Sequence, residues 1–326
     1  MRRIFFLLLF AQLAHCFAEV PRWIKNPEKE YPVSDFVRAV GEGKSLKGAK
    51  DDAISGISMY FDVSTEIATV LSKSASEIVS GDKSMFAGEQ SYSQVANVTS
   101  SSDFFCVSFT DSYYDEKRDT YSVLAYIKKS DAAKIYNSRI SFLLSSVKTY
   151  RNCATGAADR FTASRYLGKA CSLSKLAQSY IKNETTLVPA DIDRYGPVLE
   201  GLAALPAEFA DAKRGLSFKV AAVQYSEEAR PLYESLSQIL EGRGYVYALG
   251  GAMYSVVVDV SLLEDVQKSA CFVRPSVKII VMNSEGESLY SYSKTYKKVG
   301  SSNMDNAKRR ALVQIQKDVE ENFLAD

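Results

Sequence analysis

The clearest alternation of hydrophobic and polar positions lies in residues 216–326. Three short runs there, SFKVAAV, YSVVVDV and SVKIIVM, are rich in β-branched residues and predict strands. After a turn at residues 283–286, the run ESLYSYSKTY alternates tyrosine with serine or threonine, which is typical of a half-buried strand. These runs predict a sheet in the last third of the chain.

Two helices are predicted in the same region. Pro231 suits the first turn of a helix that Gly242 and Gly244 end. One face of that helix carries Leu232, Leu236, Ile239 and Leu240. A final helix has apolar residues at four-residue steps, a stripe that must be buried against the sheet. They are Ala307, Ala311, Ile315, Val319 and Phe323. The order strand, helix, three or four strands, helix predicts a two-layer α+β module over residues 216–326.

Residues 130–215 show helical periods instead. One long helix is predicted from an unbroken series of apolar positions at steps of three and four: Tyr136, Ile140, Leu143, Val147, Tyr150, Ala154, Ala157 and Phe161. A second series, Tyr166, Ala170, Leu173, Ala177 and Tyr180, predicts a partner helix. The run KNETTLVPADIDRYGP then breaks the pattern, and a shorter helical piece carries Leu199, Leu202, Leu205 and Phe209. We expect an antiparallel hairpin that acts as a spacer or clamp, because a tetratricopeptide array needs about three repeats.

Residues 19–129 predict another sheet-and-helix module. A strand at Phe36–Val40 ends at Gly41 and Gly43, and Ser45 reads as the cap of a helix. The expected buried face of that helix is narrow and consists of Leu46, Ala49, Ala53, Ile54 and Ile57. Runs at 104–109 and 121–127 predict strands around the hairpin loop TDSYYDEKRD. Gly41-Glu42-Gly43 lacks the rest of a phosphate-binding motif, so close helix–sheet packing explains it better.

The first 18 residues have the order of a secretory signal peptide. Arg2 and Arg3 precede an apolar stretch, Ile4 to Ala14, which is shorter than the roughly 20 residues that a membrane span needs. Cleavage after Ala18 would leave a soluble, exported chain. The alternative is a lipoprotein cut before Cys16, where the acyl chains would anchor the protein in a membrane; the bulky His15 at the preceding position disfavours it.

Loss of this leader changes the available chemistry. His15 is the single histidine, so the mature chain would have no imidazole for a catalytic triad or a typical transition-metal site. The 40 basic and 39 acidic residues become 38 and 39, so no basic excess favours nucleic acid. We therefore predict no cofactor, no metal site and no catalytic residue.

Four cysteines remain in the mature chain, at positions 106, 153, 171 and 271, and their spacing matches no CxxC motif. Buried thiols are the simplest interpretation of all four, since cysteine is often buried without a bridge. An exported protein can nevertheless form disulfides. If one forms here, Cys153 with Cys171 is the expected pair.

Two functional alternatives come from other classes. Ser172-Leu173-Ser174-Lys175 matches the S-x-x-K motif of penicillin-recognising enzymes, and Ser301-Ser302-Asn303 matches their S-x-N element, which would suggest a cell-wall serine hydrolase. The third element, K-T-G, is missing. Leu173 is expected on the buried seam of a helix and Lys175 on its solvated face. A periplasmic solute-binding protein is the other alternative and would need an apolar pocket between the two modules.

The N-terminal third of the chain resembles a known family. PRW after the leader, then RAVGEGKSLKGAKDDAISGI and FTDSYYDEKRDTYSVLAYI, are similar to the Lpp-twenty-like domain of bacterial outer-membrane lipoproteins over Pro21 to Ile127. The resemblance implies a Gram-negative envelope protein of a family without a known catalytic site, often lipidated at a cysteine such as Cys16.

The sequence as a whole predicts an α+β protein of two two-layer modules joined by a helical hairpin. We expect a non-catalytic structural or assembly component of the periplasm or outer membrane. Its partners would be other envelope proteins or further copies of itself, and the inner leaflet of the outer membrane if a lipid anchor is present.

Overall fold

The computed structural model describes residues 20–61, 73–75, 77–79, 81–82, 106–267 and 270–324 of the chain. The chain forms two compact units. The first consists of Met1–Val70, Ser100–Ile140 and Ser179–Asp193, and the second of Leu71–Thr99, Ser141–Gln178 and Arg194–Asp326. The predicted leader and Cys16 lie outside the described residues, so cleavage and lipidation stay predictions. No helix within the described ranges is both long and apolar enough to span a membrane.

The first unit contains an antiparallel sheet built on β4 (Thr120–Lys128). On one side β4 pairs with β1 (Phe36–Gly43), in a register that runs from Phe36 opposite Lys128 to Gly43 opposite Tyr121. On its other side β4 pairs with β2 (Ser108–Phe109) and β3 (Tyr113–Asp115). The loop predicted at 110–119 was therefore wrong in part. Tyr114 and Tyr121 pack with ring centroids 4.7 Å apart, and this cross-strand contact favours a strand there.

Helix α3 (Leu46–Phe61) covers one face of this sheet, and glycines allow it to lie very close. A Cβ added at Gly41 would stand 2.1 Å from the Ala49 carbonyl oxygen, and one at Gly43 would stand 2.6 Å from the Ala49 nitrogen. From the helix side, a Cβ at Gly56 would lie 2.6 Å from the Ala39 Cβ. These distances confirm helix–sheet packing as the reason for the glycines.

The cap and the face of α3 were predicted with partial success. The Ser45 Oγ accepts a hydrogen bond from the Gly48 N–H at 3.1 Å, which confirms the cap. The fully buried positions are Ala49, Ala53, Ile57 and Phe61. Leu46 is 39% exposed, so its place in the predicted face was wrong. It is the first residue of the helix, where the stripe has not yet come over the sheet.

The short helices α1 (Arg22–Lys25) and α2 (Pro27–Glu30) precede this sheet. The Tyr31 ring that follows them contacts Phe36 on β1 and Tyr126 on β4, with centroids 5.4 and 4.5 Å apart. The Glu28 carboxylate accepts hydrogen bonds from the Arg38 guanidinium and the Val33 N–H. The residues after the predicted leader are thus fixed to the strands β1 and β4.

Two long helices, α6 (Lys129–Thr155) and α7 (Arg160–Leu187), form the predicted antiparallel hairpin, and each contributes to both units. Tyr136 faces Tyr180 and Tyr150 faces Tyr166, with ring centroids 5.7 and 6.3 Å apart. The prediction of one unbroken helix as far as Phe161 was wrong. Gly156 follows the end of α6, and the Asp159 carboxylate accepts the Thr162 N–H at 2.9 Å to start α7.

The predicted break after Tyr180 was also placed too early. Helix α7 continues to Leu187, because Asn183 and Glu184, polar in sequence, are buried at 3% and 0% exposure. The Asn183 amide donates to the Tyr136 hydroxyl at 3.3 Å. A short 3-10 turn, η2 (Pro189–Asp191), leads into α8 (Ile192–Ala203) and α9 (Leu205–Lys213), which replace the single shorter helix expected.

The second unit carries a mixed sheet of strand order β10-β8-β7-β5-β6, with β9 also pairing with β8. Its strands are β5 (Ser217–Ala222), β6 (Val246–Tyr247), β7 (Tyr254–Gln267), β8 (Ala270–Met282), β9 (Ser288–Thr295) and β10 (Val299–Ser301). Strands β5, β6 and β7 are parallel, and the other pairs are antiparallel. A 3-10 turn, η3 (Glu227–Ala229), precedes the first covering helix.

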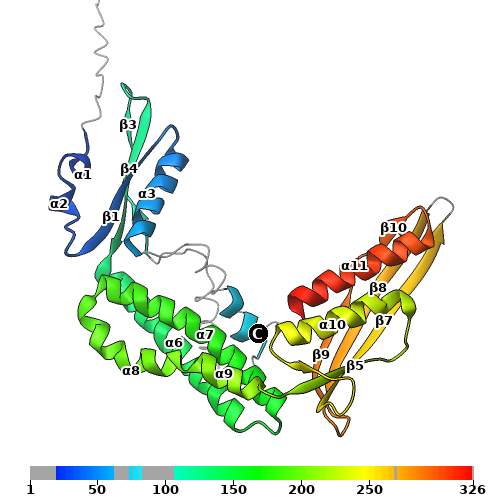
Figure 1. Ribbon diagram of the computed structural model, residues 1–326. Helices are drawn as coiled ribbons and strands as arrows, with labels where there is room; N and C mark the ends of the chain where they lie inside the picture. The colour runs from blue at the N-terminus through cyan, green and yellow to red at the C-terminus, as the bar shows by residue number, and fades with distance from the viewer. Residues whose placement is uncertain are drawn as a thin grey trace, which may run out of the picture. The chain divides into compact units, whose positions relative to one another are not determined.

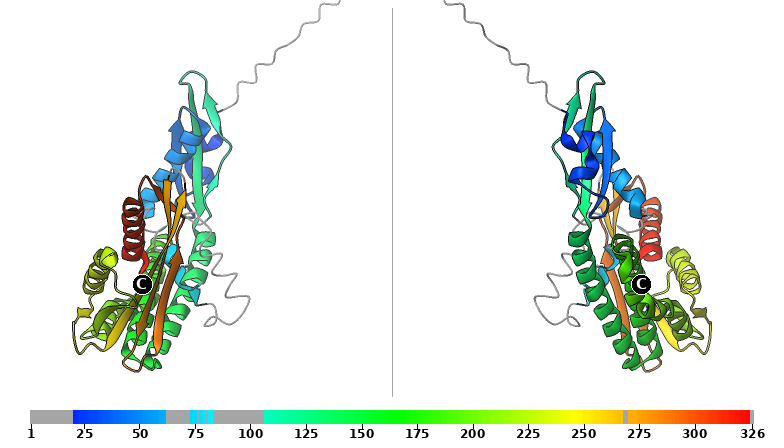
Figure 2. Two further views of the ribbon diagram at one scale, coloured as in Figure 1. Left: turned by 90° about the vertical axis from the view of Figure 1, so that its right-hand side faces the viewer. Right: turned by 90° about the vertical axis from the view of Figure 1, so that its left-hand side faces the viewer.

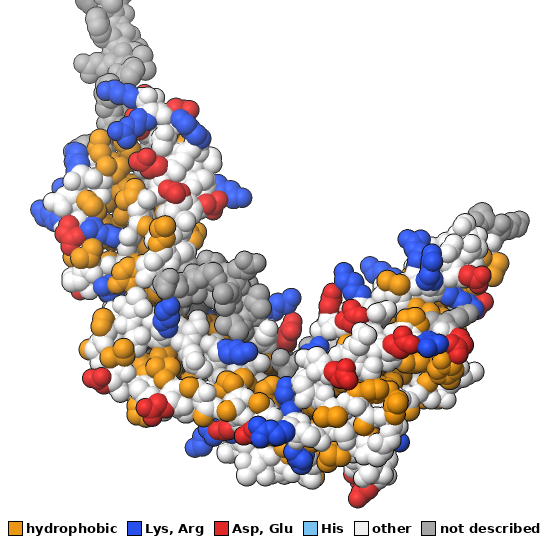
Figure 3. All heavy atoms as spheres, in the orientation of Figure 1, with side chains coloured by type: hydrophobic (Ala, Val, Ile, Leu, Met, Phe, Trp, Pro, Cys, Tyr) orange, Lys and Arg blue, Asp and Glu red, His pale blue; other side chains and the backbone are white. Residues whose placement is uncertain are grey.

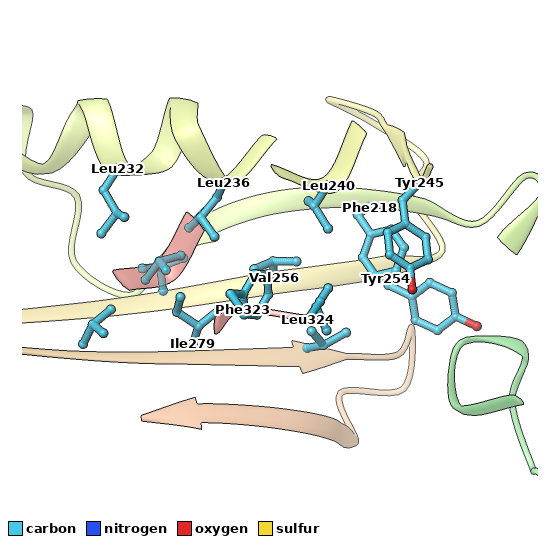
Figure 4. Close-up of a cluster of buried hydrophobic side chains, with 14 of the residues drawn as sticks. Phe218, Leu232, Leu236, Leu240, Tyr245, Tyr254, Val256, Ile279, Phe323 and Leu324 are labelled. Carbon is cyan, nitrogen blue, oxygen red and sulfur yellow. The ribbon is translucent and has the colours of Figure 1, made fainter. Parts of the chain in front are cut away.

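Helices α10 (Arg230–Gly242) and α11 (Met304–Asn322) lie on the same face of that sheet, as Figures 1 and 2 show. Leu232, Leu236 and Leu240 of α10 point at Val256 and Ile279 of the strands (Figure 4). The α11 stripe predicted from four-residue steps is fully buried at every position. The predicted α+β class, with two sheet-and-helix modules and a helical hairpin, is confirmed.

Candidate functional site

A groove opens on the helical face of the C-terminal sheet, between the start of α10 and the flank of α11. Its volume is about 450 Å³. Its walls are Pro231, Leu232, Asp305, Lys308, Arg309, Leu312, Val313 and Gln316. We call this site the α10–α11 groove. Hydrophobic side chains are visible on this region of the molecule beside Lys and Arg side chains (Figure 3).

The groove follows from the different starting points of the two helices. Helix α10 begins at Arg230, and Pro231 occupies its first turn. Helix α11 covers β8 and β10 from its own first residue, Met304. The buried stripe of α11 fixes the rotation of that helix. It leaves Leu312 half-buried on the flank and Val313 59% exposed, and Pro231 and Leu232 at the start of α10 form the other wall of the groove.

Strand β7 contributes to the core that the two helices cover. The half-buried residues Val260 and Leu262 pack against the core from β7, and Leu312 packs against the same core from α11. The neighbouring strand β5 pairs with β7 only over Tyr254–Val258. Beyond that point no described strand pairs with β7 on the β5 side. On the β5 side, the edge of β7 is therefore paired as far as Val258, and no described strand pairs with it beyond that residue.

Charge is distributed unevenly around the groove. The Lys308 ammonium lies 2.8 Å from the Glu264 carboxylate of β7, which ties the helix flank to the strand. The exposed Arg309 donates to the Asn306 side chain at 3.3 Å, an uncharged partner. Asp305 lies at the end of the groove near the N-terminus of α11, where a carboxylate is favourable. With Lys308 paired to Glu264, the wall carries one further positive side chain, Arg309, and one negative side chain, Asp305.

A polar cluster holds α11 against the strands on its other side. Tyr292 and Lys294 of β9 and the Tyr296 hydroxyl, the last at 2.7 Å, all donate to the Asp318 carboxylate of α11. Burial alone would raise the pKa of Asp318, but these three hydrogen bonds outweigh it and hold the pKa below its usual value of 3.8. Burial and the same carboxylate raise the pKa of Tyr292 and Tyr296, so both remain neutral donors.

The residues of the hydrolase alternative occupy structural positions. Ser172 and Lys175 lie on α7, with Leu173 buried and Lys175 exposed as predicted. Asn303 is the N-cap of α11, where its side chain accepts the Asn306 N–H at 2.8 Å. The structure thus gives Asn303 a capping role and Leu173 a packing role. No described group of three or more histidine, cysteine, aspartate or glutamate side chains is arranged to hold a metal ion.

The cysteine pair suggested by the sequence is not joined in the structure. Cys171 is buried on α7, and Cys153 is half-buried near the end of α6. The register set by Tyr150 and Tyr166 places Cys153 opposite position 163, eight residues from Cys171. At 1.5 Å per residue this is a separation of about 12 Å along the helix axis, too far for a disulfide. The helical register therefore does not support this pair.

Sequence reasoning did not find the α10–α11 groove. One signal was available: Leu312 and Val313 are adjacent apolar residues that fall outside the four-residue stripe of the last helix. Two apolar residues beyond an already complete four-residue stripe widen the apolar face of the helix, so at least one of them is expected on a flank. The sequence contains no comparable signal for the open edge of β7, because that edge depends on where β5 ends in the folded sheet.

The comparisons with known proteins give remote likenesses. No protein-family model matches the chain, and no curated protein matches it. Among solved structures, the secreted protein HP1454 from Helicobacter pylori is similar at 8% identity and a TM-score of 0.37, over 88% of this chain and 98% of that one.

Two bacterial lipoproteins are also similar. The minor lipoprotein from Acinetobacter baumannii matches at 11% identity and a TM-score of 0.28, over 34% of this chain and 91% of that one. Lipoprotein GNA1162 from Neisseria meningitidis matches at 13% identity and a TM-score of 0.25, over 32% of this chain and 99% of that one. With TM-scores below 0.5, these likenesses do not establish a shared fold.

Proposed function

We propose that this chain is an exported, non-catalytic interaction component of a bacterial cell envelope, and that it binds a partner protein through the α10–α11 groove. The observation that carries the proposal is the groove itself. Leu232, Leu312 and the 59% exposed Val313 form an apolar lining inside a charged border. Apolar patches rimmed by polar residues are typical of protein interaction sites on soluble proteins.

The envelope location rests on the sequence of the first 18 residues and on the resemblance of the N-terminal third to the Lpp-twenty-like domain. Both predict export and neither requires catalysis. In such a protein the groove would contact another envelope component. Residues 22–31, which are fixed to the N-terminal sheet, would hold the start of the mature chain against that sheet.

A photo-crosslinking amino acid at Val313, introduced in the full-length protein in its own host, tests the groove. We expect a discrete crosslinked product in the envelope fraction. The matched control is the same amino acid at Gln314, which is exposed on α11 but does not line the groove. Equal products from both positions, or none from Val313, would contradict the proposed binding site.

Intact mass of the protein purified from that envelope fraction tests the location. A chain that begins at Glu19, or one that begins at an acylated Cys16, supports export and distinguishes simple secretion from lipidation. A chain recovered from the cytosol with Met1 and His15 still attached would contradict the location, whatever the crosslinking shows.

A further inference from the structure

The backbone of β7 points alternate hydrogen-bonding groups at its open edge. The Val223 N–H donates to the Val258 carbonyl at 2.8 Å, so Val258 directs its carbonyl toward the β5 side. Residues two apart in a strand point their backbone groups the same way. The N–H and C=O groups of Val260, Leu262, Glu264 and Val266 therefore face the edge that β5 leaves open.

The side chains of these four residues point to the helical face of the sheet. Val256 and Val258, which have the same parity, are fully buried under the helices. Val260 and Leu262 are half-buried against the core under the helices, and Glu264 meets Lys308 of the groove wall. A strand laid along this edge would likewise direct every second side chain into the α10–α11 groove.

We propose that the open edge of β7 receives an extended strand from a partner protein, with apolar residues at alternate positions and an acidic residue placed to meet Arg309. This inference rests on the proposed function and specifies its mode of binding. The backbone groups from Val260 to Val266 span six residue steps, or about 20 Å, which suits a partner segment of about seven residues.

The other edges of the sheet are protected against such pairing. Strand β9 carries Lys294, and Lys297 and Lys298 follow it; lysines at an edge oppose strand addition. Strand β6 has two residues and β10 has three, too short to template a partner. The open part of β7 instead carries apolar residues on both faces, since Leu263 and Val266 are 65% and 71% exposed.

Charge favours a different protein over a second copy of this chain. Two β7 edges paired about a two-fold axis would bring the flanks of two α11 helices, each with an exposed Arg309, to the same interface. Like charges so placed oppose association. Lys308 already has Glu264, so Arg309 is the residue whose charge a partner carboxylate would balance.

Exposed residues at the end of β5 set one limit of the site. Val223 and Tyr225 follow the last paired residue of β5 and are 65% and 59% exposed. The Tyr225 ring packs against Tyr233 of α10 with centroids 5.7 Å apart, which holds it beside the start of the groove. An added strand would meet these two side chains at one end and would extend toward Gln267 at the other.

Amide hydrogen exchange on the full chain tests the proposal with a defined probe. The probe is a pool of synthetic ten-residue peptides with apolar residues at alternate positions, threonine or serine between them, and one glutamate. We expect exchange to slow by tenfold or more at the amides of Val260, Leu262, Glu264 and Val266. The amides of the intervening residues, which already bond to β8, should not change.

Two substitutions at one position separate backbone pairing from side-chain packing. Leu262→Pro removes the N–H that faces the open edge together with the leucine side chain, and proline is tolerated at strand edges. It should weaken peptide binding by tenfold or more, whereas Leu262→Thr, which keeps the N–H, should weaken it less. Arg309→Gln should reduce the preference for glutamate-bearing peptides, with Arg310→Gln as the neighbouring control.

A change in the peptide covers the case in which Leu262→Pro fails to fold. N-methylation of the peptide at alternate residues should abolish protection with the protein unaltered. No protection from any peptide, or protection without alternation along β7, overturns strand addition. If the Val313 crosslink persists in that case, the groove still binds a partner by another mode. If the crosslink is absent while alternating protection is present, strand addition to β7 is supported and the proposed binding of an envelope partner is contradicted.

Discussion

The two sheets of this protein are covered by helices in different ways. Helix α3 lies so close to β1 that Gly41, Gly43 and Gly56 have no room for a side chain. Helices α10 and α11 pack on their sheet through side chains, leucine on α10 and alanine, isoleucine and valine on α11, and a groove lies between the two helices. Where α3 packs directly on glycine, no space remains between the helix and the sheet. Where α10 and α11 pack through larger side chains, a groove remains beside α11 at the level where α10 begins.

The largest expected effect breaks the close packing of the N-terminal sheet. Gly41→Val would place a side chain against the backbone of α3, which cannot move away without leaving the sheet. We expect a loss of more than about 3 kcal/mol in the free energy of unfolding, measured by denaturant titration. Gly201→Ala on α8 is the control, because a Cβ there meets nothing within 4 Å, and it should be neutral or stabilising. Similar losses from both variants would contradict the account of α3.

A second substitution tests the aliphatic packing of the C-terminal sheet. Ile315 of α11 is fully buried against the sheet, and Ile315→Ala should cost about 3 kcal/mol of unfolding free energy by leaving a cavity. Val313→Ala, two residues away on the exposed flank, should cost less than about 0.5 kcal/mol. If Val313→Ala proved as costly as Ile315→Ala, the flank of α11 would have to be part of the core and not the wall of a groove.

The smallest of the three effects depends on pH. Asp318→Asn removes the charged acceptor of Tyr292, Lys294 and Tyr296, and should cost about 2 kcal/mol at neutral pH. Because the folded state lowers the pKa of Asp318, its contribution is present above the ordinary value of 3.8 and is lost as pH falls through the lower, folded pKa. The difference between the wild type and Asp318→Asn should therefore shrink in acid. A difference that stays constant down to pH values below both pKa values would show that the charge of Asp318 does not hold α11.

Local pattern predicted much of this fold. The four-residue stripe of α11 and the alternation of β9 were visible in the sequence, and both elements lie where they were expected. The long helix was predicted to run through Gly156 because its apolar series continues in register across the turn, and only the cap at Asp159 divides it. Strand β7 was predicted too short, since Ser261, Glu264 and Asp265 interrupt the hydrophobic run while still fitting an exposed strand.

The candidate site could not be predicted from the sequence in the same way. It depends on the place where α10 starts beside α11, two segments about 75 residues apart in the sequence, and on the place where β5 leaves β7. Neither feature produces a periodic pattern of apolar residues in the local sequence. Arg309 and Val313 look like ordinary surface residues of an amphipathic helix, and only the structure shows that they line the α10–α11 groove.

The unpaired half of β7 has a practical consequence for anyone who handles the protein. An unpaired strand edge with exposed apolar side chains can pair with any extended chain, including one from a neighbouring molecule that is unfolding. Preparations concentrated without the natural partner should slowly form sheet-rich aggregates that begin at this strand. A short peptide that occupies the edge should keep the protein in solution.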